Sequence, residues 1–133
     1  MKATLHTDGG ARGNPGPAGI GYVLVVEDKA SIFHAGYIGE TTNNQAEYQA
    51  LVAGMKRALK EGVQELACYL DSELVVKQVR GEYRVKNMDL KPWVDEVQAL
   101  RRQIAKVSFT HVRREKNKAA DRLVNEAIDG HLN

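Results

Sequence analysis

Four carboxylates of this sequence differ from its other acidic residues in their surroundings. Each lies at the expected end of a strand or start of a helix, or beside glycines and uncharged polar residues: Asp8, Glu47, Asp71 and Asp121. Taken singly, each has a structural explanation as a helix cap, a favourable charge at a helix N-terminus or a turn residue. Taken together, all four could converge, because ligands of open α/β sheets bind at the edge where strands end and helices begin.

A cluster of this kind predicts a particular chemistry. Crowded carboxylates repel one another and raise one another's pKa values, so they stay partly protonated unless cations neutralise them. Hard divalent ions with oxygen ligands do this, and the sequence has no Cys/His set for zinc, which leaves Mg²⁺ or Mn²⁺. Two such ions bridged by carboxylates form the apparatus for in-line attack on a phosphodiester. The one cysteine, Cys68, lies in an apolar run and is predicted to be a small core residue.

The first half of the chain must position Asp8 and Glu47. Residues 2–8, 20–27 and 31–38 are rich in β-branched and aromatic residues and are separated by the turn signals GNPGPAG and EDKA, which predicts an antiparallel meander of three strands. Apolar residues at spacings of three and four predict a helix over residues 44–59, with Glu47 in its first turn. The continuous apolar run at residues 66–70 predicts a strand that is covered on both faces.

The second half alternates helices and strands. Four elements are predicted: a short helix capped by Asp71 or Ser72 and ended by Gly81, a helix over residues 90–104, a strand over 107–112 and a helix over 120–128. The order βββαβααβα favours an α/β fold, with a mixed sheet flanked by helices and parallel strands in its second half.

Composition and charge narrow the class of protein. The 133 residues are 43% hydrophobic and 27% charged, which is typical of globular proteins and supports one domain over residues 1–133. Because no stretch resembles a secretory signal or a membrane span, we expect a soluble, cytoplasmic protein. We also expect a freestanding monomer. The formal net charge is +2, yet residues 77–118 hold 12 Lys and Arg against 5 acidic residues. This segment either faces a polyanion or forms ordinary solvated helix faces.

The four acids lie within motifs that carry a resemblance over nearly the whole chain. In order, the segments TDGGARGNPGPAGIGYVL, TTNNQAEYQAL, LDSELVVKQV and NKAADRLVNEA resemble the type 1 ribonuclease H family, from Thr7 to about Ala127. The resemblance implies a ribonuclease H-like fold, with a five-stranded mixed sheet of order 3-2-1-4-5. It also implies an endonuclease that hydrolyses the RNA strand of RNA/DNA hybrids with two Mg²⁺ ions, Mn²⁺ being able to substitute, and leaves 5′-phosphate and 3′-hydroxyl ends.

The resemblance also assigns roles to residues. It makes the four acids both the metal ligands and the catalytic residues. It places substrate contacts at Gly9, Gly10, Asn14, Thr42, Asn43, Asn44 and Gln45. Three further candidates, Glu73, Arg113 and Arg114, stand where the sequence departs from the family. Short polar side chains suit this task, because the minor groove of A-form-like duplexes displays 2′-hydroxyls and base edges. For Asn43 and Asn44, capping of the helix is the alternative role.

Three departures from the family pattern are visible. The basic protrusion of many bacterial members is reduced to residues 81–89, so hybrid binding is expected to be weaker or to use the cluster Lys77, Arg80, Arg84, Lys86 and Lys91. Glu73 replaces a frequent glutamine, and we expect it to point away from the phosphates or to contact a donor. Many members of the family carry a histidine in the loop before the last acid, and the corresponding residues 112–117 of this sequence contain none. His111 is predicted to be a packed strand residue, and Arg113 or Arg114 is expected to stabilise phosphate charge, without acting as a base.

These departures keep two alternatives open. A member without the protrusion could also cut double-stranded RNA. A chain with Glu73 and without the histidine could be a hybrid-binding module with weak catalysis.

Overall fold

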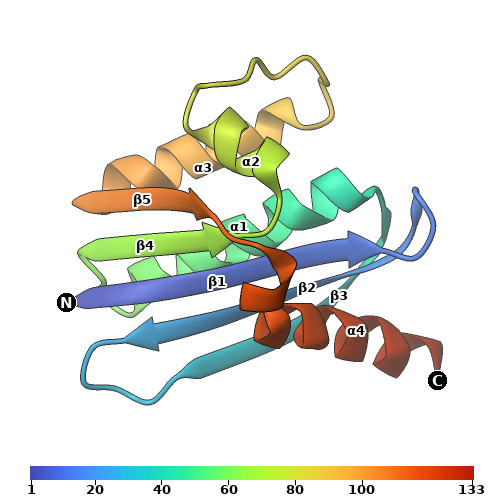
Figure 1. The fold of residues 1–133 in the computed structure, drawn as a ribbon, viewed down its shortest axis with the longest axis horizontal. Helices are drawn as coiled ribbons and strands as arrows, with labels where there is room; N and C mark the ends of the chain where they lie inside the picture. The colour runs from blue at the N-terminus through green and yellow to red at the C-terminus, as the bar shows by residue number, and fades with distance from the viewer.

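The computed structural model describes all residues 1–133 and contains one five-stranded sheet with helices on both faces (Figure 1). The elements are β1 (Lys2–Ala11), β2 (Gly16–Val26), β3 (Ile32–Thr41), α1 (Asn43–Lys60), β4 (Glu65–Leu70), α2 (Glu73–Val79), α3 (Lys91–Gln103), β5 (Lys106–His111), the 3₁₀ turn η1 (Arg114–Lys116) and α4 (Lys118–Leu132). The sheet order is β3-β2-β1-β4-β5. The fold class and the sheet order implied by the sequence are therefore confirmed.

The central strand β1 sets the position of the functional edge. It pairs antiparallel with β2 and parallel with β4, and β4 pairs parallel with β5. The last pair of the β1–β4 ladder is Thr7 with Leu70. Asp8 and Asp71 each follow this pair directly, so both acids emerge at the same edge of the sheet.

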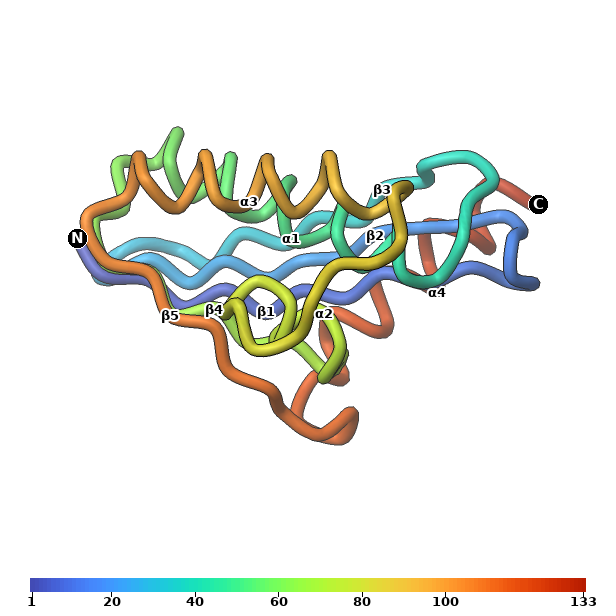
Figure 2. The backbone as a smooth tube through the Cα atoms, turned by 90° about the horizontal axis from the view of Figure 1, so that it is seen from above, coloured from blue at the N-terminus to red at the C-terminus, as the bar shows by residue number.

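The helices divide between the two faces of the sheet. Helices α1 and α3 lie together on one face and α4 lies on the other (Figure 2). The core forms mainly between the sheet and α1 and α3, and it includes Leu5, Leu24, Tyr48 and Cys68, all with no exposed surface. The prediction that Cys68 is a core residue is confirmed, and burial raises the pKa of its thiol. No helix combines the length and the apolar composition that crossing a bilayer requires.

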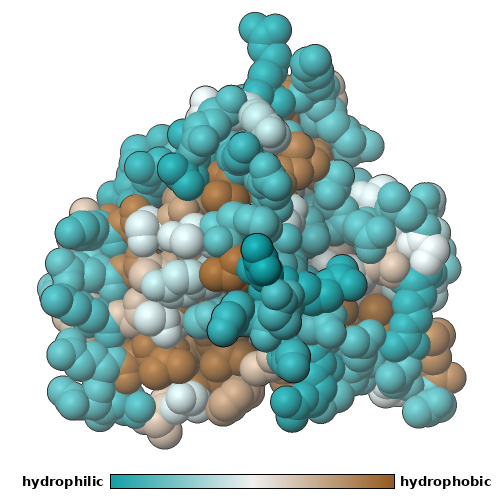
Figure 3. Space-filling view, in the orientation of Figure 1, coloured by the Kyte–Doolittle hydropathy of each residue, from teal (hydrophilic) through white to brown (hydrophobic).

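The prediction that the fourth strand is covered on both faces is wrong. Leu66, Cys68 and Leu70 are buried, but the alternate residues of β4 are only partly buried. The reason is that α4 covers β2 and β3 and leaves β4 and β5 open on that face. There Tyr69 stacks on His6 with ring centroids 4.9 Å apart. Weakly polar and apolar side chains are exposed over this uncovered part, on the left of Figure 3.

The second strand begins earlier than the predicted residue 20, because part of the segment GNPGPAG, expected to be a turn, belongs to the strand. β2 starts at Gly16, and the register with β3 shifts between Ala18 and Gly19. The glycines of this strand serve the packing of α4. A Cβ on Gly21 would lie 2.5 Å from the carbonyl oxygen of Ala120. Glycine therefore allows α4, which carries Asp121, to lie directly on the strand.

Candidate active site

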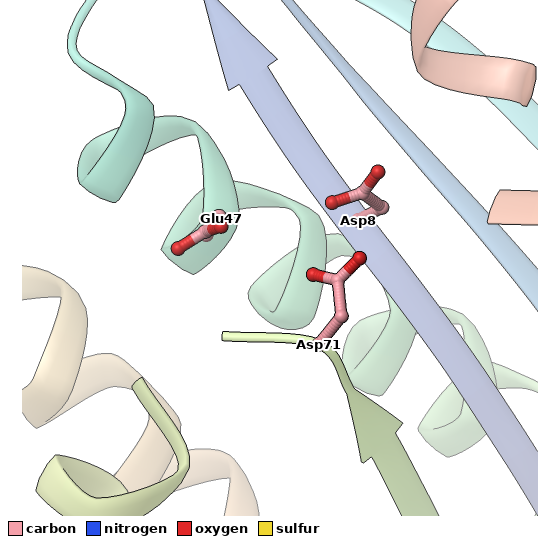
Figure 4. Close-up of side chains that lie close together, drawn as sticks. All are labelled: Asp8, Glu47 and Asp71. Atoms are coloured by element: carbon pink, nitrogen blue, oxygen red, sulfur yellow. The ribbon is translucent and has the colours of Figure 1, made fainter. Parts of the chain in front are cut away.

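Three of the four predicted acids meet where the pairing of β1 with β4 ends. The expected end of the first strand at residue 8 is wrong, because β1 continues to Ala11 in its ladder with β2. Asp8 lies on β1, Glu47 on α1 and Asp71 directly after β4, and their side chains point toward one another (Figure 4). One carboxylate oxygen from each lies within 4.8 Å of the other two. The fourth acid, Asp121, lies in the first turn of α4 and lines the same cleft of about 330 Å³ as Asp8 and Glu47. The structure thus brings all four acids together.

The approach of α1 to β1 depends on a glycine. A Cβ on Gly9 would lie 2.2 Å from the carbonyl oxygen of Ala46, a distance that no side chain tolerates. The Asp8-Gly9 and Ala46-Glu47 segments therefore lie side by side. Because α1 begins at Asn43, Glu47 lies in the second turn of the helix and not, as expected, in the first.

Burial and the repulsion between carboxylates dominate the electrostatics of the cluster. The pKa of Asp8 is raised to about 8, first by burial and then by the negative charges of Asp71, Asp121 and Glu47. Burial raises the pKa of Glu47 to about 7, although the Ser72 hydroxyl and the charge of Arg114 act in the opposite direction. One carboxylate oxygen of Asp71 is buried without a hydrogen-bond partner.

This set of donors fits a divalent metal ion. All the groups are carboxylate oxygens, which hard cations such as Mg²⁺ and Mn²⁺ prefer. The raised pKa values and the unpartnered oxygen of Asp71 are the features that a bound cation would relieve, because positive charge stabilises the ionised carboxylates. The residues that would hold the metal are Asp8, Glu47, Asp71 and Asp121.

Two asparagines join the β1–β2 turn to the start of α1. The backbone N–H of Asn43 donates to Asn14 Oδ1 at 3.0 Å, and the N–H of Ala11 donates to Asn43 Oδ1 at 2.8 Å. The helix cap is Thr42, whose hydroxyl accepts from the N–H of Gln45 at 3.2 Å. The alternative that Asn43 or Asn44 caps the helix is therefore wrong, since the structure assigns the cap to Thr42.

The loop before α4 distinguishes the two candidate arginines. Arg114, the first residue of η1, lines the acidic cleft. Arg113 has a side chain that is 84% exposed and lies 4.0 Å from Glu115. His111 ends β5, as predicted for a strand residue, but it is exposed, so the prediction that it is packed is wrong.

Glu73 lies apart from the acids that form the cleft. It occupies the first turn of α2, after the cap Ser72, and its carboxylate pairs with Lys77 at 3.1 Å. This agrees with the expectation that Glu73 contacts a donor. Lys77 also lies over the ring of Tyr83, 4.9 Å from its centroid.

Several residues of the site were missed in the sequence. Ser72 was considered only as a helix cap, yet its hydroxyl also interacts with Glu47. Arg12 and Asn125 line the cleft next to Asp121, and Arg12 forms an ion pair with Asp129 and a hydrogen bond of 3.4 Å to Asn125. The spacing of Asp121, Asn125 and Asp129 by four residues, which puts them on one face of a helix, is the signal that could have revealed this row.

The comparisons with known proteins agree with this geometry. The family model described as "Reverse transcriptase-like" matches residues 6–127. The chain is 44% identical to the bifunctional protein Rv2228c of Mycobacterium tuberculosis over 97% of its own length and 36% of that protein. The crystallised N-terminal RNase H domain of Rv2228c, fused to maltose-binding protein, matches with a TM-score of 0.93 over 97% of this chain and 100% of that one, at 43% identity.

Two further structures are similar. RNase H1 of the archaeon Halobacterium salinarum has a TM-score of 0.93 and 39% identity over 98% of this chain and 99% of that one. LC11-RNase H1, whose structure is in complex with an RNA/DNA hybrid, has a TM-score of 0.92 and 43% identity over 98% and 99% of the two chains. The chain spans about a third of the length of its curated mycobacterial relatives and 63% of the Halobacterium relative named Ribonuclease HI. With a family model that covers nearly the whole chain and this agreement in fold, the chain belongs to the reverse transcriptase-like family and, within it, to the type 1 ribonucleases H.

Proposed function

We propose that this chain is an endonuclease that hydrolyses the RNA strand of RNA/DNA hybrids and leaves 5′-phosphate and 3′-hydroxyl ends. The observation that carries the proposal is the meeting of three carboxylate oxygens, from β1, α1 and the end of β4, within 4.8 Å of one another. The hybrid bound in the LC11-RNase H1 structure supports the choice of substrate.

We propose Mg²⁺, two ions per site, as the metal, with Mn²⁺ able to substitute. When bound, such ions activate a water molecule and stabilise the negative charge that develops on the leaving oxygen. Asp8, Glu47, Asp71 and Asp121 would hold them, and these acids come from β1, α1, the end of β4 and α4. Metal-dependent attack by water needs no covalent intermediate on the protein.

Arg114 supplies a fixed positive charge at the edge of this cluster. Its effect on the pKa of Glu47 places it within electrostatic reach of the acids, and it lines the cleft. A guanidinium stays protonated, so Arg114 stabilises charge on the scissile phosphate but takes no proton from water. We infer that Arg114, rather than Arg113, takes the position of the missing histidine.

The polar start of α1 is the proposed contact with the minor groove. Asn43 lines the cleft, its backbone N–H donates to Asn14 Oδ1, and the backbone of Gly10 also lines the cleft, where no side chain covers it. Thr42, Asn44 and Gln45 are half-buried residues of the same helix start, next to Asn43. Their amide and hydroxyl groups match the 2′-hydroxyls that distinguish an RNA strand from a DNA strand.

The basic segment offers a surface for the rest of the duplex. The exposed residues after α2 include Tyr83, Arg84 and Lys86, and Lys91 follows at the start of α3. Arg80 pairs with Glu82 at 2.7 Å and Lys77 pairs with Glu73, so these two cations are already partly neutralised. The unpaired cations Arg84 and Lys86 are therefore the proposed phosphate contacts in place of the basic protrusion.

The test is cleavage of a hybrid that is labelled on its RNA strand, with Mg²⁺, with Mn²⁺ and with a chelator. Labelled single-stranded and double-stranded RNA serve as controls, and the ends of the products are mapped. Asp71→Asn should abolish cleavage while the fold is retained, whereas Asp28→Asn, which changes an exposed residue in the β2–β3 turn, should not.

The possible outcomes distinguish the proposed function from its alternatives. Cutting of the hybrid alone, in a metal-dependent way, supports the proposal. Cutting of double-stranded RNA as well would indicate a broader ribonuclease. Binding of the hybrid without cutting would indicate the binding module, and cutting by Asp71→Asn at the wild-type rate would refute the assigned role of the acids.

A further inference from the structure

Asn117 is a buried polar residue at the junction between the last helix and the central strand. It is only 2% exposed, and its side-chain Nδ2 donates to the carbonyl oxygen of Thr7 at 2.9 Å. Thr7 directly precedes Asp8 and is the last residue of β1 that pairs with β4. The side chain of Asn117 therefore connects the start of α4 to β1 at the point where the acidic cluster begins.

The backbone of the same residue holds two further parts of the site. The N–H of Asn117 donates to the carbonyl oxygen of Arg114 at 2.9 Å, which closes η1. Its carbonyl oxygen accepts from the N–H of Asp121 at 3.1 Å, in the first turn of α4. Three hydrogen bonds from one residue thus reach the segments that carry Asp8, Arg114 and Asp121.

The side chain of Asn117 does not serve as a helix cap. Although Asn117 precedes α4, its side chain makes no capping hydrogen bond. Its amide oxygen is buried without a partner, so the N–H donor is the part of the side chain that the structure uses. A buried amide that stabilised only its own helix would bond within that helix, whereas this one bonds to a residue 110 positions away.

The apolar packing of α4 does not by itself fix the position of the first turn of this helix. Ala120, Val124 and Ile128 are buried against the sheet and hold α4 there by apolar contact. Apolar contacts are not directional, so they do not by themselves fix the first turn of α4 to better than the fraction of an ångström that a catalytic group requires. A hydrogen bond to a strand carbonyl does fix it.

We propose that Asn117 is a positioning residue that holds Asp121 and Arg114 in place relative to Asp8. This inference rests on the proposed function, because its kinetic consequence exists only if the chain cleaves hybrids. A loss of the bond would let the first turn of α4 shift, and shifts of about 1 Å at a catalytic group can cost about 100-fold in rate.

The experiment compares Asn117→Ala with a matched control, Gln98→Ala. Gln98 also donates from a side-chain amide to a backbone carbonyl, that of Val79, at 2.9 Å, but it connects α3 to α2 away from the acids. Both variants are studied at a temperature where their unfolding curves show them to be folded. Three quantities are measured: kcat and KM on a hybrid, Mn²⁺ binding by calorimetry, and hydrogen exchange of the Asp121 amide without metal.

For Asn117→Ala we expect kcat to fall about 10- to 100-fold with little change in KM, weaker Mn²⁺ binding and faster exchange at Asp121. Gln98→Ala should lose stability but keep all three quantities near wild type. If Asn117→Ala has the kcat, Mn²⁺ affinity and Asp121 exchange of wild type, or if Gln98→Ala changes them equally, the positioning role is refuted.

The variant Asn117→Ser and the hydrogen exchange of the Asp121 amide, measured without metal, allow the proposal to be tested even if Asn117→Ala does not fold or the chain cleaves no hybrid. If Asn117→Ala does not fold, Asn117→Ser, which retains a shorter donor, is measured in its place and is expected to lie between wild type and the values given for alanine. If the wild-type chain cleaves no hybrid, the proposed function fails. The exchange of the Asp121 amide and the Mn²⁺ affinity then still report whether Asn117 holds the acids together.

Discussion

Replacement of Asp8 by asparagine should stabilise the metal-free protein at alkaline pH. In the folded chain the pKa of Asp8 is raised from 3.8 to about 8 by burial and by Asp71, Asp121 and Glu47. The unfolded chain therefore releases this proton first, and stability falls as the pH rises from about 4 and through 8. Above that range the folded state must carry an ionised Asp8 among three other acids.

The magnitude follows from the same shift. One pKa unit corresponds to about 1.4 kcal/mol, so the change from 3.8 to about 8 sets a ceiling of about 6 kcal/mol on the destabilisation. Entry of water into the open cleft and small movements of the side chains reduce this, and we expect Asp8→Asn to add about 1–3 kcal/mol to the free energy of unfolding at pH 9.

Urea unfolding in a chelator, at pH 4.5 and at pH 9, measures this effect. Near pH 4.5 the folded Asp8 is protonated, so the variant should differ little from wild type. Asp28→Asn, in an exposed turn, removes the same charge away from the cluster and is the control. If Asp8→Asn stabilises no more at pH 9 than Asp28→Asn does, or equally at both pH values, then the repulsion argued from the structure is absent.

Three further predictions concern the metal, the packing and the salt dependence. Because the pKa of Glu47 is raised to about 7 and that of Asp8 to about 8, metal binding must release protons, so the affinity for the metal should rise between pH 6 and 8.5. Calorimetry in buffers of different ionisation enthalpy measures this proton release. A pH-independent affinity with no proton release would contradict the prediction. Gly9→Ala should cost about 3 kcal/mol of stability, because its Cβ meets backbone, whereas Gly130→Ala, with open space around its Cβ, should stabilise by up to about 1 kcal/mol in urea unfolding. Removal of the positive charge of Lys86 should reduce the slope of log affinity for the hybrid against log salt by about 0.7–0.9; an unchanged slope would mean that this residue contacts no phosphate.

Local patterns were enough to predict the elements and the four acids. Apolar periodicity decides between helix and strand, and an acid that directly follows the buried run of a strand lies at the functional edge even where, as at Asp8, the strand itself continues. This is why Asp8 and Asp71 were found without knowledge of their neighbours. Glu47 was also found, although its turn within α1 was not, because helix boundaries depend on the cap.

The remaining features depend on contacts between distant segments, which local patterns do not contain. Gly21 lies within the predicted second strand, but the approach of α4, which requires a glycine there, is visible only in the structure. β4 looked buried on both faces, but the position of α4 leaves one face open. The hydrogen bond of Asn117 spans 110 residues, and no spacing in the sequence indicates it.

The bond between Asn117 and Thr7 also has a consequence for the timing of synthesis. A nascent chain that has emerged as far as β5 contains Asp8, Glu47 and Asp71 on adjoining strands and a helix, but not Arg114 or Asp121. The second half of the site comes with α4, whose start docks against the central strand β1. A chain whose last helix has not docked thus lacks Asp121 at the site, and docking of α4 on β1 completes the acidic cluster.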